Sequence, residues 1–70
     1  MENNIFGKRL KELRLEKNLS QKDLSKNINV GKSIISAWET GLSDPTLTNL
    51  ISMAKFFDVS IDYLAGLTDY

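Results

Sequence analysis

The chain has 70 residues, which is enough for one domain and too few for two. It contains neither cysteine nor histidine, which excludes disulfides, thiolate metal sites and an imidazole base. The formal net charge is zero, but the first 32 residues carry eight basic and four acidic side chains, and the remainder carries one basic and five acidic. A basic half can face phosphates while the acidic half faces away, which weakly favours a nucleic-acid partner.

The N-terminal residues show no basic segment followed by an apolar run, so no signal peptide is predicted. No stretch of the chain approaches the length of a membrane span. We therefore expect a cytoplasmic protein that makes no contact with a membrane.

The first predicted helix covers about residues 5–17. Phe6, Leu10 and Leu13 lie at positions i, i+4 and i+7 and form one apolar stripe. Asn18 is expected to end the helix, because asparagine tolerates the left-handed conformation found at helix C-caps.

The second predicted helix covers about residues 21–27. Ser20 is expected to be its N-cap, and Asp23 completes a close variant of the capping box. Leu24 is expected to face the core. Residues 29–31 then form a tight turn that leads into the next helix.

The third predicted helix covers residues 32–40, with Gly41 beyond its end. Ile35 and Trp38 point to one side and are expected to fix the helix to the core. The opposite face is small and polar and consists of Lys32, Ser33, Ser36, Ala37 and Thr40. Ile34 lies at the edge of the buried arc, and its contact stays open between the core, a sugar and a thymine methyl.

A fourth helix is predicted after Pro45, with Thr46 as its N-cap. Its buried stripe is expected to contain Leu47, Leu50, Ile51, Ala54 and Phe57. A fifth helix is predicted from Ser60 to Gly66, with Ile61 and Leu64 facing inward. No segment has the period-2 alternation of a strand, so the predicted fold class is all-α.

Two short helices joined by a tight turn, the second with an apolar inner side and a small polar outer side, are typical of a helix-turn-helix. A major groove about 12 Å wide admits such a helix when its outer side is slim and hydrophilic. The N-terminus of the preceding helix offers free N–H groups and a positive dipole end to a phosphate. These features predict binding to double-stranded DNA.

Part of the sequence resembles a known family, the Cro/Xre type of phage-repressor helix-turn-helix domain. The resemblance is carried by residues 21–25 (QKDLS), Val30, residues 35–41 (ISAWETG), Pro45 and residues 57–66 (FDVSIDYLAG). It covers about residues 5–67 and implies a five-helix, lambda-repressor-like fold. It also implies a transcription regulator of bacterial or phage genes, in the first place a repressor.

The family pattern and the helix-turn-helix geometry together predict the residues that contact DNA. Base contacts are expected from Gln21, Lys32, Ser33, Ser36 and Ala37. Phosphate contacts are expected from Ser20, Gln21, Lys22, Thr40, Leu42 and Ser43, the last two through their backbone amides. For Lys32 the alternatives of a base contact and a phosphate contact stay open, and Ser20 is first of all a helix cap.

Two further positions follow from the resemblance. Arg14 and Glu39 match a structural ion pair that ties the first helix to the third in relatives. Asp44 lies where many members have a basic residue that holds the DNA backbone, so we expect weaker electrostatic affinity.

The sequence favours neither catalysis nor cofactor binding. It has no activated nucleophile, no glycine-rich phosphate loop and no carboxylate pair in an apolar setting, so we expect no enzyme, no metal and no cofactor. The alternative to DNA binding is a protein-interaction module with the same fold, such as a toxin-binding antitoxin.

We expect residues 1–70 to form a single domain, either a complete small protein or the N-terminal part of a longer repressor. We also expect a homodimer on DNA, formed through the fifth helix and the C-terminal residues. Tyr63, Leu67 and Tyr70 support this expectation, because five small helices cannot bury so much apolar surface.

Overall fold

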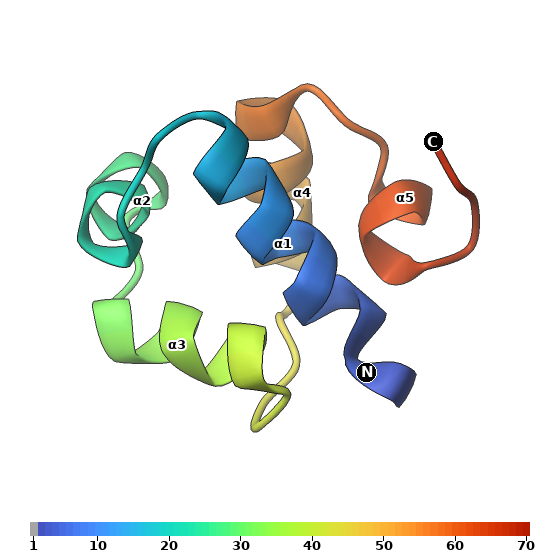
Figure 1. The fold of residues 1–70 in the computed structure, drawn as a ribbon, viewed down its shortest axis with the longest axis horizontal. Coiled ribbons are helices and arrows are strands. Elements are labelled where there is room, and N and C mark those ends of the chain that lie inside the picture. The colour runs from blue at the N-terminus through green and yellow to red at the C-terminus, as the bar shows by residue number, and fades with distance from the viewer. Residues whose placement is uncertain (1) are drawn as a thin grey trace.

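The computed structural model describes residues 2–70, and every regular element in that range is helical. The elements are η1 (Glu2–Asn4), a short 3-10 helix, followed by α1 (Ile5–Glu16), α2 (Gln21–Ile28), α3 (Lys32–Thr40), α4 (Leu47–Phe57) and α5 (Ile61–Ala65) (Figure 1). The predicted all-α class with five α-helices is confirmed, and η1 is an addition. The longest helix in this range has 12 residues, and none combines the length and hydrophobicity that crossing a membrane requires.

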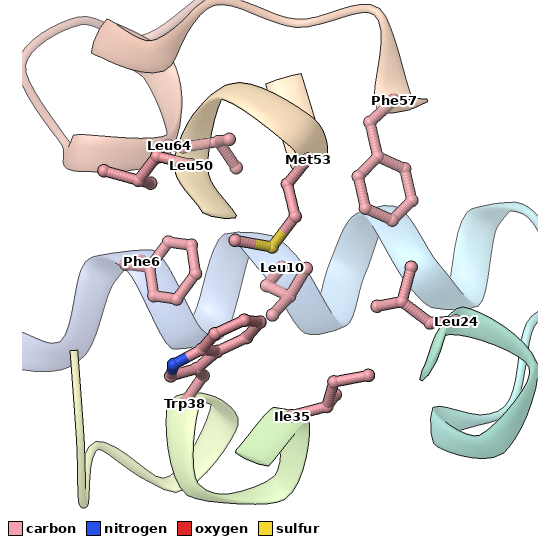
Figure 2. Packing of buried hydrophobic residues seen from close by; sticks show 9 residues of the cluster. All are labelled: Phe6, Leu10, Leu24, Ile35, Trp38, Leu50, Met53, Phe57 and Leu64. Carbon is pink, nitrogen blue, oxygen red and sulfur yellow. The ribbon is translucent and has the colours of Figure 1, made fainter. Parts of the chain in front are cut away.

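One hydrophobic core joins all five α-helices (Figure 2). Its buried members are Phe6 and Leu10 of α1, Leu24 of α2, Ile35 and Trp38 of α3, Leu50, Met53 and Phe57 of α4, and Leu64 of α5. The rings of Phe6 and Trp38 meet edge to face, with their centroids 6.0 Å apart. Each helix therefore buries one face against the others, and the described residues share a single core.

The buried face of α4 differs from the predicted one. The side chains of Leu47 and Ile51, predicted to be buried, are 66% and 38% exposed, whereas Met53 is fully buried. The apolar pattern was ambiguous because seven of the eleven residues of α4 are apolar, so two neighbouring faces fit a helical period. Packing selects the face that contains Leu50, Met53 and Phe57.

Left-handed residues follow all five α-helices and explain why these helices stop. They are Asn18, Asn29, Gly41, Asp58 and Gly66, with φ angles between 55° and 83°. Glycine has no Cβ, and asparagine and aspartate tolerate this region because their short side chains can bond to the nearby backbone. The predicted helix ends at Asn18 and Gly41 are confirmed.

The N-terminus of α2 is closed by the capping box that the sequence predicts. The Ser20 hydroxyl accepts a hydrogen bond from the Asp23 N–H, and the Asp23 carboxylate accepts one from the Ser20 N–H, each 3.0 Å long. The bonds from the Ser20 backbone and hydroxyl lower the pKa of Asp23 below its usual value. The part of the box in which the carboxylate accepts the Ser20 N–H is therefore strongest while Asp23 is ionised.

We expect Ser20→Ala to lower the free energy of unfolding by about 1 kcal/mol, because the Asp23 N–H loses its acceptor. A lowered carboxyl pKa stabilises the fold above its unfolded-state value, and this contribution is lost as pH falls through the folded-state pKa. Urea unfolding at pH 6 and pH 3 measures both effects. Asp23→Asn, which cannot titrate, should lose less stability between these pH values than the wild type; an equal loss contradicts this account.

The chain beyond α5 folds back onto α1. The Arg9 guanidinium donates to the backbone oxygens of Tyr63 and Thr68, the latter at 2.7 Å. Its Cζ lies 4.3 Å from the centroid of the Tyr63 ring, and Nη2 is 3.8 Å from a carboxylate oxygen of Asp69. Arg9 thereby holds the C-terminal residues beside α5, where Figure 1 shows the end of the chain.

Candidate nucleic-acid interface

The turn between α2 and α3 sets the angle of the helix pair. Asn29 adopts a left-handed conformation with φ 56°, and Gly31 caps α3 with φ −68° and ψ 147°. Val30, between them, packs half-buried against the core, and its N–H donates to the Ser25 carbonyl at 3.2 Å. Three residues therefore change the direction of the chain and fix the start of α3.

The inner face of α3 is held tightly against the core. Ile35 is fully buried and Trp38 is 2% exposed. A Cβ atom at Gly7 would collide with the carbonyl oxygen of Trp38, so only glycine allows α1 to approach α3 this closely. Rigid support of this kind is what a helix that reads a groove requires.

The outer face of α3 is not covered by the chain the structure describes. Lys32, Ser33 and Thr40 are exposed, and Ser36 and Ala37 are half-buried. Figure 1 shows α3 along the lower edge of the molecule, with α1 above it. The side predicted to enter the major groove is thus accessible along the whole helix.

The hydroxyl of Thr40, predicted to contact a phosphate, is engaged in hydrogen bonds within α3. Its hydroxyl lies 2.9 Å from the Ser36 carbonyl oxygen and 3.3 Å from the Ala37 carbonyl oxygen, and it donates within the helix. The hydroxyl must rotate before it can donate to a phosphate.

Glu39 connects three helices. The structure contains the ion pair expected with Arg14, with Nε to Oε2 at 2.8 Å and Nη2 to Oε1 at 3.1 Å. The two side chains are only 9% and 4% exposed, and Arg14 also donates to the Leu19 carbonyl at 2.8 Å. Glu39 Oε1 accepts a further bond of 3.2 Å from the Gln21 side-chain amide. The pair therefore fixes Gln21, at the start of α2, against α3.

The N-terminus of α2 brings together three predicted contacts, Ser20, Gln21 and Lys22. The N–H groups of Gln21 and Lys22 occupy the first positions of the helix, where no intrahelical acceptor exists. Lys22 is exposed, and Gln21 is half-buried, with one amide hydrogen given to Glu39. The remaining donors and the helix dipole favour an anion such as a phosphate.

Comparison with known families identifies the domain type. The family model described as helix-turn-helix matches residues 10–64, which is more than half of the chain. The chain belongs to the Cro/Xre-type helix-turn-helix family. The resemblance stated from the sequence is thus confirmed.

Solved relatives of this Cro/Xre-type domain share its lambda-repressor-like fold. The c2 repressor of Salmonella phage P22, solved with a synthetic operator, has a TM-score of 0.81 and 32% identity, over 86% of this chain and 91% of that one. Bacillus subtilis SinR, solved with DNA, has a TM-score of 0.79 and 33% identity, over 86% and 97% of the two chains. The predicted fold is confirmed.

Curated relatives are named as transcriptional regulators. An uncharacterised helix-turn-helix regulator of Methanocaldococcus jannaschii is 43% identical over 54 residues, which are 77% of this chain and 82% of the relative. Three longer regulators match with 35–41% identity, and the chain spans only 29–58% of their length.

The loop after α3 of this Cro/Xre-type domain uses its backbone amides to close the helix. The N–H groups of Leu42 and Ser43 were expected to bond a phosphate, but both donate to the Ala37 carbonyl, at 2.9 Å and 3.4 Å. These bonds close the C-terminus of α3 around left-handed Gly41. The phosphate contacts of Leu42 and Ser43 stay a prediction, and their amides would have to share or leave the Ala37 carbonyl to make them.

Asn4 supports the interface from a position that sequence reasoning missed. Its side-chain amide donates to the Glu39 carbonyl at 3.1 Å, across 35 residues of sequence. Asn4 is left-handed, with φ 50°, and stands at the N-cap of α1 without capping it through its side chain. Asparagine is a signal for this conformation, but nothing in the sequence marks Glu39 as its partner.

Proposed function

We propose that this chain binds double-stranded DNA at specific sequences and regulates transcription of bacterial or phage genes as a repressor. The observation that carries the proposal is α3, whose inner face is buried while its outer face is polar and accessible beside the N-terminus of α2. The relatives named as repressors and regulators, two of them solved with DNA, support it. A protein with this target acts in the cytoplasm and performs no catalysis.

The first test is selection of bound sequences from a random duplex library, followed by titration of the selected operator at several salt concentrations. Phosphate contacts predict that log K falls by about 0.9 per neutralised phosphate for each log unit of salt. Absence of binding at low salt contradicts the proposal. That result would favour the alternative function, a protein-interaction module. The zero net charge of the chain supports this alternative.

Lys32→Ala and Ser33→Ala separate base reading from phosphate contact. Because both side chains are exposed at the first turn of α3, each change should lower affinity for the operator by about 1–3 kcal/mol and leave binding to a scrambled duplex unchanged. Fluorescence anisotropy measures both affinities. Lys55→Ala, an exposed lysine on α4, is the matched control and should alter neither. An equal loss of affinity for the operator and for the scrambled duplex would show that these residues contact phosphates rather than bases.

The proposed active form is a homodimer on a two-fold symmetric operator, with half-sites about 34 Å apart. Leu67 and Tyr70 are 78% and 90% exposed beyond α5, and this apolar surface supports a contact there. Arg9 bonds to Thr68 and Asp69, the two residues between them, and so fixes this part of the chain. Analytical ultracentrifugation on the operator should show two chains per duplex, and a single chain counts against the dimer.

A further inference from the structure

Ile34 is a large apolar side chain on α3 that the core does not cover. It is 45% exposed, whereas Ile35 and Trp38 on the same helix are almost fully buried. Single exposed apolar residues are ordinary on protein surfaces, so exposure alone assigns no role. Ile34 also lies in the first turn of α3, next to the exposed residues Lys32 and Ser33. This position indicates a role in the proposed interface.

The surroundings of Ile34 are apolar on one side and polar on the other. A Cβ at Gly31 would lie 3.9 Å from both Ile34 Cδ1 and Ser33 Oγ, so the methyl and the hydroxyl border the same spot at the start of α3. Ala37 follows Ile34 by three residues, and residues at this spacing are neighbours on a helix surface. Ile34 and Ala37 therefore form an apolar edge along the polar outer face.

This apolar edge matches a feature of one base. In the major groove, thymine presents its C5-methyl group beside the O4 acceptor, and the other bases present only polar atoms or hydrogen there. A methyl packed on Ile34 would leave Ser33 free to donate to a neighbouring acceptor. We propose that Ile34, with Ala37, recognises the 5-methyl group of a thymine in the operator. The inference rests on the proposed DNA-binding function and adds a base identity to it.

Deoxyuridine tests the inference, because it lacks only the methyl group. Each thymine of the selected half-site is replaced in turn, and affinity is measured by fluorescence anisotropy. At one position the wild type should bind about four-fold more weakly, which corresponds to ~0.8 kcal/mol for one buried methyl-sized group at 1.4 kcal/mol per tenfold change. Ile34→Ala should lose most of this preference and bind the thymine and deoxyuridine duplexes with affinities less than about two-fold apart, because only Ala37 then remains beside the methyl.

Two further variants make the experiment specific. Ile34→Ser places a small polar side chain without a methyl group at the same position, and it should also lose the four-fold preference. Leu47→Ala removes an exposed apolar side chain from α4 and should keep it. Circular dichroism checks that each variant folds, which is expected because neither Ile34 nor Leu47 belongs to the core.

The outcomes separate this inference from the proposed function. A preference for the methyl that persists in both Ile34 variants, or a wild type indifferent to every thymine methyl, overturns the role of Ile34 and leaves DNA binding intact. Equal weakening of both duplexes by Ile34→Ala also overturns it, because the side chain then acts without reading the methyl. A wild type that binds no duplex at low salt overturns both proposals.

Discussion

Glu39→Gln is expected to lower the free energy of unfolding by about 3–5 kcal/mol, because it leaves the Arg14 charge buried without its partner. The Arg14 side chain is 9% exposed, and two of its bonds end on the Glu39 carboxylate. The Leu19 carbonyl alone cannot neutralise a guanidinium. Urea unfolding followed by circular dichroism measures the change.

The ion pair of Arg9 with Asp69 provides the matched control. The Asp69 side chain is fully exposed and 3.8 Å from Arg9, so Asp69→Asn should cost at most about 1 kcal/mol. Replacing both members of the buried pair, as Arg14→Met with Glu39→Leu, should recover much of the loss, because no uncompensated charge remains. A cost for Glu39→Gln no larger than for Asp69→Asn contradicts a structural role for the pair.

Trp38→Ala should cost about 3–5 kcal/mol, since it leaves a large cavity where α1 and α3 meet. Trp38 is 2% exposed, and its ring packs edge to face on Phe6. A domain of 70 residues has little stability in reserve, so a loss of this size removes much of the folded population. Trp38 is the only tryptophan in the chain, so circular dichroism must follow the unfolding.

Leu47→Ala is the contrasting change, because Leu47 was predicted to be buried and is 66% exposed. Its removal should alter the free energy of unfolding by less than about 0.5 kcal/mol. Trp38→Phe, which keeps an aromatic ring, should fall between the two alanine variants. A large loss of stability in Leu47→Ala would indicate that Leu47 is buried, as the sequence predicted, and would contradict the observed packing of α4.

Local signals predicted much of the fold. Ser20 with Asp23, left-handed Asn18 and Gly41 each act within a few residues, so their effects can be read from neighbouring positions. Periodicity was sufficient for α3, where Ile35 and Trp38 are the buried pair. It was insufficient for α4, where the abundance of apolar residues left two faces equivalent until neighbouring helices packed against it.

Contacts between distant residues were the part that the sequence concealed. Arg9 bonds to Tyr63 and Thr68, more than 50 residues away, and no local pattern marks a guanidinium for a backbone oxygen. The bond from Gln21 to Glu39 was missed for the same reason, although both residues were selected as candidates. The pair of Arg14 and Glu39 was expected only through resemblance to a family.

The two faces of α3 differ in burial, and under the proposed function this difference has an evolutionary consequence. Ile35, Trp38 and Glu39 secure the helix, whereas Lys32 and Ser33 contribute nothing to the core. Mutations on the outer face can therefore accumulate with little penalty in folding, since surface substitutions change stability by only about 0.5 kcal/mol. Duplicated copies of such a gene could diverge toward new target sequences while they keep the same scaffold.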